Sequence, residues 1–250
     1  MEHIMLVKEE KTIPLREEIS SADPILKQQH FVLVHGISGG SWCWYKIKSL
    51  MENSGYKVSC IDLKSGGIDQ SDVDSVLSFD DYNQPLLDFM SSLPHNEKGV
   101  PDLSEFGDVY ELGFGLGHDK PPTSAMMKRE FQRKISYPLS PHEDWTLAAM
   151  LLRPGPILAL MSARFEENGE VEKVPRVYIR TKQDKVVKPE QQEAMIKKWP
   201  PLNVYELENS DHNPFFSSPF ILFGLLVKVA ATFEVGCNYT SIAETQRPPY

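Results

Sequence analysis

The amino-acid sequence predicts an α/β fold built on a mostly parallel, doubly wound sheet. The first sign is a set of short apolar runs, rich in β-branched and aromatic residues, that lack the polar alternation of half-buried strands. The second sign is that a segment with helical spacing follows each of the first two runs, as in strand–helix–strand units with right-handed crossovers. A length of 250 residues suits one domain of this class.

The first part of the chain opens with two predicted strands, each followed by a predicted helix. HFVLVHG (30–36) predicts a strand that is buried on both faces. Residues 41–55 have helical spacing and end in Gly55, a residue suited to a C-cap. YKVSCIDL (56–63) predicts the second strand, and residues 80–93 predict the second helix, with aspartates at its start.

Beyond residue 98 this alternation is interrupted. A third buried strand is due, but residues 99–122 are rich in glycine and proline instead. The remaining expected elements are helices at 123–135 and 140–153, a strand at 175–184, a helix at 190–199, a strand at 203–209 and a helix at 219–233.

Composition argues against several classes of protein. The chain has 26 basic and 35 acidic residues and a net charge of −9, without a basic cluster, so we expect no nucleic-acid partner. Three cysteines are too few for a disulfide framework, and the histidines lack metal-ligand spacing, so we expect no metal. The charged N-terminus does not fit a secretory signal, and the longest apolar run is too short to span a membrane. We therefore expect a cytoplasmic protein without a membrane partner.

Two residues at strand ends could carry acid–base chemistry. Asp184 ends the strand predicted at 175–184, and His212 follows the strand predicted at 203–209. In open parallel sheets, ligands bind at the carboxyl ends of the strands. An acid followed by a histidine matches the order of the last two members of a hydrolase triad, in which imidazole removes the proton of the nucleophile and carboxylate orients the imidazole. The alternative is a loop aspartate and a surface histidine without a catalytic role.

The loop HGISGGSW (35–42) follows the first predicted strand and allows two interpretations. Residues 36–40 fit the pattern G-x-S-x-G of a nucleophile elbow, which would make Ser38 the nucleophile. A His-Gly loop of this kind also offers backbone N–H groups to an oxyanion. Because the loop follows the first core strand, whereas the elbow normally follows a later and more central one, we favour the oxyanion interpretation.

Several long strings resemble the plant methylesterases, which are α/β-hydrolases related to hydroxynitrile lyases. The match begins at HFVLVHG, covers about 28–232, and is most similar to the subgroup that acts on methyl indole-3-acetate. It leaves a loose N-terminal arm at 1–27 and a loose tail at 233–250. The strings are HG-x-x-x-G-x-W from His35, FDDYNQPLLDFMSSLP, GVPDLSEFGDVYELGFGLG, VPRVYIRTKQDKVVKPEQQEAMIKKWPP and SDHNPFFSSPFILFGLLVK.

The resemblance implies an α/β-hydrolase fold with a helical lid at about 100–165. It implies that Asp184 is the triad acid, that His212 is the base and that Ile37 supplies an oxyanion N–H. The implied substrates are small methyl esters, such as methyl indole-3-acetate, methyl jasmonate and methyl salicylate, cleaved without a cofactor. A homodimer is compatible with membership of this family. Gly36 and Asn213 stand where lyases have threonine and lysine, which favours ester hydrolysis.

The chain departs from the family pattern at the nucleophile. The family has a V-G-H-S-x-G-G elbow after a strand that should begin near Lys98, but here SSLPHNEK runs directly into GVPDLSEFG. A strand–helix–strand unit of about 30 residues or more is therefore expected to be missing between Lys98 and Gly99. The missing strands would lie between the strands at 30–36 and 175–184, so the sheet is expected to be incomplete. The alternative function is thus a catalytically inactive isoform, at most a small-ligand binder.

Overall fold

The computed structural model describes residues 3–7, 29–89, 108–163 and 174–243, with residues 3–7 and 234–243 described as backbone only. Two parallel strand pairs confirm the predicted α/β class. Strand β2 (His30–Val34) is parallel to β3 (Lys57–Ile61), and β6 (Val177–Thr181) is parallel to β7 (Asn203–Leu207).

The strand β2 is buried on both faces, as its unbroken apolar run predicts. Phe31 and Leu33 pack into a core with Trp44 and Ile47 of the first helical segment. Val32 and Val34 face the opposite side and pack with a second core that includes Val76, Tyr82 and Ala159. Helices on both faces of the strand therefore explain why the sequence shows no polar alternation here.

The helices η1 (Ser41–Trp44) with α1 (Tyr45–Asn53), α2 (Phe79–Phe89), α7 (Pro189–Lys198) and α9 (Pro219–Ala243) follow the predicted order. The short helices η2 (Val73–Ser75) and α8 (Pro214–Ser217) were not predicted. Helix α9 continues to Ala243, so the expectation of a loose tail from residue 233 is wrong for its first part. The expected end of the second helix at residue 93 lies outside the described residues.

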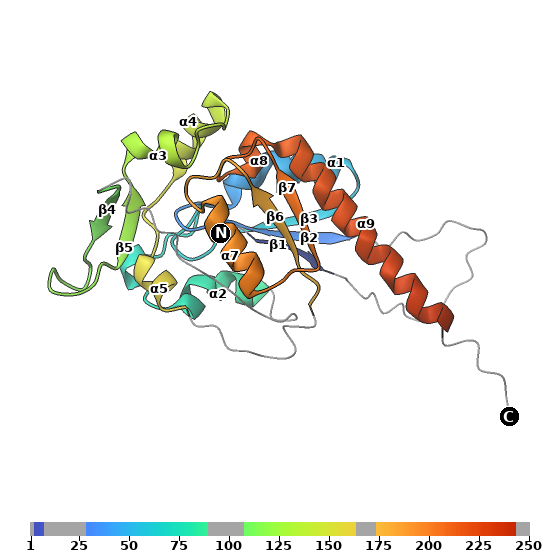
Figure 1. The fold of residues 1–250 in the computed structure, drawn as a ribbon. Helices are drawn as coiled ribbons and strands as arrows, with labels where there is room; N and C mark the ends of the chain where they lie inside the picture. The colour runs from blue at the N-terminus through green and yellow to red at the C-terminus, as the bar shows by residue number, and fades with distance from the viewer. Residues whose placement is uncertain (1–2, 8–28, 90–107, 164–173, 244–250) are drawn as a thin grey trace.

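A lid-like group of elements lies to one side of the strands (Figure 1, green to yellow). It contains the antiparallel pair β4 (Tyr110–Gly113) and β5 (Ser124–Met127), followed by α3 (Arg129–Ile135), α4 (His142–Leu151) and α5 (Ile157–Met161). The sequence predicts a helix over 123–135, but pairing with β4 holds residues 124–127 in a strand. Long-range pairing overrides local helical spacing here.

The N-terminal residues contain a strand that the sequence interpretation missed. Strand β1 (His3–Val7) pairs antiparallel with β2 in the register His3↔Val34 to Val7↔His30, so the expectation of a loose arm is wrong for these five residues. The strand order is β1-β2-β3, which puts β1 on the edge of β2 opposite β3. Among the described residues, no ladder joins this sheet to the β6–β7 pair.

Candidate active site

Asp184 and His212 lie side by side, as their strand-end positions predict. Asp184 follows β6 and His212 follows β7, and His212 Nδ1 lies 3.0 Å from Asp184 Oδ2. The carboxylate is 6% exposed. Its Oδ1 accepts hydrogen bonds from the N–H groups of Val186 and Val187 at 2.8 and 2.9 Å, and its Oδ2 accepts one from the Thr181 hydroxyl at 3.1 Å.

These contacts keep the Asp184 carboxyl ionised. Burial acts to raise its pKa, but the charge and hydrogen bond of His212, together with the N–H groups of Val186 and Val187, outweigh burial and hold the pKa below its usual value. An ionised carboxylate at Nδ1 fixes the imidazole tautomer that carries its proton there. Nε2 is then the nitrogen suited to act as a base.

The loop that carries His212 is attached to the lid through Asp211, a residue that the sequence interpretation did not identify. Asp211 is fully buried. Its Oδ2 accepts hydrogen bonds from Leu139 N at 2.9 Å, from Ser140 N at 2.8 Å and from Ser140 Oγ at 3.0 Å, and its Oδ1 accepts one from Asn213 N at 3.0 Å. Its sequence neighbours Ser210 and Asn213 are polar, so no local pattern marks this carboxylate as buried.

The His35 side chain forms the base of the Gly-rich loop. Its Nε2 accepts a hydrogen bond from Leu63 N at 2.9 Å, so the ring proton lies on Nδ1, which donates to Gly36 O at 2.7 Å. Burial lowers the pKa of His35, with only partial compensation from Gly36 and Asp62. Asp62 secures the other end of the loop by accepting hydrogen bonds from Ser41 N and Ser41 Oγ at 2.6 and 3.0 Å.

Ile37 and Ser38 form the tip of this loop. Within the described part of the chain, the Ile37 N–H makes no hydrogen bond, which leaves it available to an oxyanion. Ser38 has a φ of 67°, in the left-handed region, and its carbonyl accepts a hydrogen bond from Arg153 N at 3.1 Å. Among the described residues, its hydroxyl donates no hydrogen bond to His212.

The Gly-rich loop and the segment that carries His212 line the same cavity, which has a volume of about 120 Å³. The loop forms one part of its wall, the residues around His212 form another, and β4, β5 and α3 contribute a third. The wall residues are Gly36, Ile37, Ser38, Gly39, Trp42, Cys43, Tyr110, Met126, Met127, Gln132, Ser136, Tyr137, Leu152, Val186, His212, Asn213 and Phe215. Asp184 supports His212 from behind and does not line the cavity.

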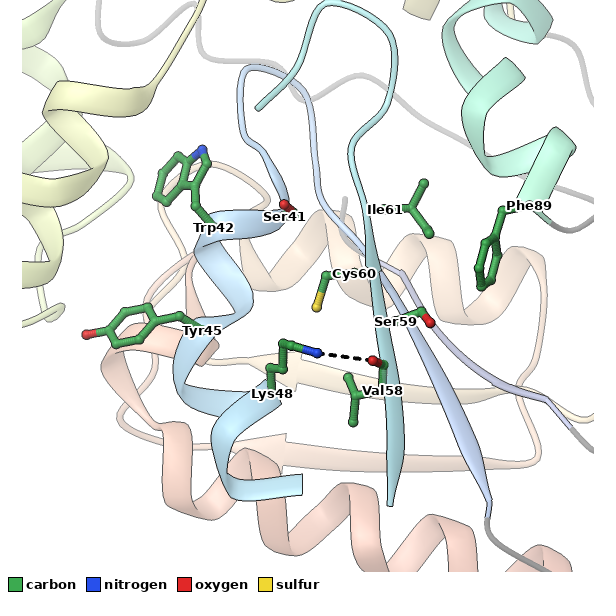
Figure 2. A pocket seen from close by; sticks show the side chains of 9 residues that line it. All are labelled: Ser41, Trp42, Tyr45, Lys48, Val58, Ser59, Cys60, Ile61 and Phe89. Carbon is green, nitrogen blue, oxygen red and sulfur yellow. Dashed lines mark hydrogen bonds between the residues drawn. The ribbon is translucent and has the colours of Figure 1, made fainter. Parts of the chain in front are cut away.

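A larger, open hollow of about 610 Å³ lies at the edge of β3 that no described strand covers, and neither Asp184 nor His212 lines it. Figure 2 shows that Val58 and Cys60 point towards α1, whereas Ser59 and Ile61 point towards Phe89. Lys48 Nζ donates a hydrogen bond to Val58 O at 3.2 Å across it. Residues from both faces of one strand line this hollow, so it is the exposed edge of a sheet rather than an enclosed site.

Two other types of site are absent from the described ranges. These residues contain no group of three or more His, Cys, Asp or Glu side chains that could hold a metal ion. None of the helices in this part of the chain is both long enough and apolar enough to cross a membrane.

Comparison with solved structures identifies similar folds. Methylesterase MES16 from Arabidopsis superposes with a TM-score of 0.74 at 36% identity, covering 81% of this chain and 99% of that chain. Tomato Methylketone Synthase I superposes with a TM-score of 0.70 at 30% identity, covering 82% and 98%. These neighbours have the α/β-hydrolase fold, which confirms the fold that the resemblance implies.

Sequence comparison identifies named relatives, although no family model matches the chain. Methylesterase 17 of Arabidopsis thaliana is 52% identical, covering 87% of this chain and 97% of the relative. Pheophorbidase of Raphanus sativus is 38% identical, covering 82% and 95%. The alignment with Methylesterase 17 has 268 positions, whereas 87% of 250 residues is about 217, so about 50 positions of the relative have no counterpart here. The identities and coverage show that this chain belongs to the plant methylesterase family of α/β-hydrolases.

Proposed function

We propose that the cavity beside His212 is the site of a carboxylic ester hydrolase that acts on small methyl esters. The observation that carries this proposal is the 3.0 Å contact between His212 Nδ1 and the buried Asp184, beside a cavity that the Gly36–Gly39 loop also lines. This arrangement combines a base, the carboxylate that orients it and an oxyanion donor around one small space.

Each of these residues would have its own role in the hydrolysis of the ester. A serine hydroxyl attacks the ester carbonyl carbon while His212 Nε2 takes the hydroxyl proton, and the Ile37 N–H stabilises the oxyanion that forms. His212 then gives the proton to the departing methoxy group, so methanol leaves and an acyl-enzyme remains. Water, deprotonated by His212, releases the acid. Asp184 stabilises the imidazolium in both steps.

The nucleophile is the part that we propose this chain lacks. No G-H-S-x-G-G string occurs in its 250 residues. The roughly 50 unmatched positions of Methylesterase 17 support a missing strand–elbow–helix–strand block. We place it between Lys98 and Gly99, a junction that lies outside the described residues. Without that block, the second candidate function is a small-ligand binder with no turnover.

The candidate substrates are methyl indole-3-acetate, methyl jasmonate and methyl salicylate, which are methyl esters of plant hormones. A small, mostly apolar cavity supports a compact acyl group. The small number of cysteines, three in 250 residues, supports a reducing compartment such as the cytoplasm.

Two chains test this proposal: the 250-residue chain, and an extended chain carrying the corresponding block of Methylesterase 17 between Lys98 and Gly99. Acid release from the three esters is followed for both. We expect turnover by the extended chain that His212→Ala abolishes, and no detectable turnover by the 250-residue chain. Failure of the extended chain on every ester would contradict the hydrolase assignment.

The test also covers Ser38 as a displaced nucleophile. If the 250-residue chain turns over an ester and His212→Ala removes that activity, the chain has its own nucleophile. A fluorophosphonate adduct mapped to Ser38 by mass spectrometry would then identify it. We expect no adduct there, because Ser38 makes no hydrogen bond to His212 in the described part of the chain.

A further inference from the structure

The two residues that flank His212 are both bonded to one segment of the lid, the connection between α3 and α4 (residues 136–141). On one side, Asp211 Oδ2 accepts three hydrogen bonds from this α3–α4 connection, at 2.8 to 3.0 Å. On the other side, Asn213 Nδ2 donates a hydrogen bond to Ser136 O at 2.6 Å. The backbone of His212 is therefore held to the lid from both sides.

Asp211 also shapes the backbone at His212. Its Oδ1 accepts a hydrogen bond from Asn213 N, two positions along the chain, at 3.0 Å, and this bond closes an Asx turn around His212. The two oxygens of one carboxylate thus fix the turn and the place of the turn against the lid. Asp211 is 0% exposed and Ser140 is 1% exposed, so water cannot replace a bond between them that is lost.

Other contacts hold the ends of this loop. Gln183 N donates a hydrogen bond to Ser210 O at 3.0 Å before the turn, and Phe216 N donates one to Asn213 O at 2.9 Å after it. The hydrogen bonds of Asp211 act between these two points, on the part of the loop where His212 lies.

The acid of the catalytic pair is held by a different part of the chain. The Asp184 carboxylate accepts its other hydrogen bonds from residues at the end of β6, namely Thr181, Val186 and Val187. The 3.0 Å contact between Asp184 Oδ2 and His212 Nδ1 therefore joins a residue fixed by the end of β6 to a residue fixed by the lid. A displacement of about 1 Å within such a pair can lower a rate about 100-fold.

We propose that Asp211 is a positioning residue, through which the lid sets the orientation of the base His212. Asp211 does not line the cavity, so it acts through His212 and not on the ligand. Loss of its bonds to the α3–α4 connection would turn the imidazole away from Asp184, lower kcat and leave KM nearly unchanged. The role of His212 as a base rests on the proposed function, whereas its position does not.

Proton NMR of the 250-residue chain tests the position of His212. An imidazole N–H in a charge-assisted hydrogen bond to a carboxylate gives a signal well downfield of the backbone amides, and the loss of this signal in His212→Gln assigns it. Asp211→Ala should lose the signal. In Asp211→Asn the side-chain amide keeps either the bonds to the lid or the turn, but not both, so we expect the signal to shift or broaden. Asp211→Asn alone carries the test if the alanine variant does not fold.

Asp144→Ala is the matched control. Asp144, in α4, is 1% exposed and also attaches the lid to the core, since it accepts hydrogen bonds from Tyr45 Oη at 2.7 Å and from Lys46 Nζ. Both partners lie in α1, away from the loop of His212. Asp144→Ala should lower the unfolding temperature, as Asp211→Ala does, and leave the downfield signal in place.

Kinetics of the extended chain give a second readout. Asp211→Ala should lower kcat about 10- to 100-fold with KM within about threefold of its original value, whereas Asp144→Ala should keep kcat within about threefold. A role of Asp211 in stability alone would lower the unfolding temperature of both variants and separate neither kcat nor the downfield signal between them.

Four outcomes would each overturn the role of Asp211. They are an unchanged signal in the Asp211 variants that fold, no downfield signal in the unmodified chain, an equal loss of the signal in Asp144→Ala, and equal losses of kcat in Asp211→Ala and Asp144→Ala. If the extended chain turns over none of the esters, the proposed function fails, and the NMR result alone decides whether Asp211 positions His212.

Discussion

Gly155 packs directly against Ile37, the proposed oxyanion residue. A Cβ atom on Gly155 would lie 2.2 Å from Ile37 Cγ1 and 2.9 Å from Ser38 Oγ. Gly155 cannot easily withdraw, because its N–H donates to Ala125 O at 2.8 Å and its carbonyl accepts from Ala125 N at 2.9 Å. The strand β5 of the lid therefore holds the oxyanion loop in place through a glycine.

Gly155→Ala should shift the loop and lower the free energy of unfolding by about 1–3 kcal/mol, the usual effect of overpacking. Urea unfolding measures the change. Gly224→Ala is the control, since a Cβ there meets nothing within 4 Å and α9 is helical at that point. The control should be neutral or stabilising by up to about 1 kcal/mol. Equal losses in the two variants would argue against contact between Gly155 and the loop.

Stability should fall as the pH falls below about 6.5, the ordinary pKa of histidine, because burial lowers the pKa of His35 below that value. The unfolded chain then binds a proton that the folded chain resists. The contribution of neutral His35 is complete above pH 6.5 and is lost as the pH falls towards the folded pKa. Chemical denaturation at pH 8, 6.5 and 5 measures it. His35→Gln should flatten this part of the profile.

Asp211→Ala should destabilise the chain by about 3 kcal/mol or more, because it leaves the N–H groups of Leu139, Ser140 and Asn213 without their acceptor in a buried place. Asp211→Asn, which retains one acceptor oxygen, should lose less. Thermal and urea unfolding measure both. A loss below about 0.5 kcal/mol for the alanine variant would show that the lid and the His212 loop are held together by other contacts.

Asp184→Asn in the extended chain should lower kcat by about 10⁴-fold, since an amide at this position no longer holds the proton on His212 Nδ1. The initial rate of acid release measures it. Circular dichroism should show an unchanged fold, because the amide oxygen can still accept from Val186 and Val187. A decrease in kcat of less than tenfold would show that Asp184 is not the acid of the triad.

A proline in β1 should weaken the sheet. N–H groups along a strand alternate in direction, so one of Ile4 and Met5 donates towards β2, and proline there removes a ladder hydrogen bond. Of Ile4→Pro and Met5→Pro, one should therefore lower the unfolding temperature more than the other, and Met5→Leu should not lower it. If neither proline variant has an effect, β1 does not contribute to the folded state.

Hydrophobic runs and chain order were enough to predict the buried strands and the contact at their carboxyl ends. The run at 30–36 predicts a strand covered on both faces, and β2 is one. The chain order of Asp184 and His212 predicts their contact because parallel strands bring their carboxyl ends to one edge. Both predictions depend on rules that relate sequence directly to sheet topology.

The features that the sequence did not predict depend on partners far along the chain. Strand β5 has helical spacing and becomes a strand only because β4 pairs with it. Asp211 accepts hydrogen bonds from residues 71 and 72 positions away, and no local pattern marks such a carboxylate.

The position of β1 has a consequence for proteolysis. One edge of a strand can hold one partner, and His3–Val7 already occupy the edge of β2 opposite β3. In the extended chain, we expect the inserted strand to take that same edge and to displace these residues. The N-terminus would then resist digestion in the short chain and be trimmed rapidly in the long one. A protease that cuts after Leu6, inside the paired strand, would distinguish the two forms in one cell extract, without an assay for either activity.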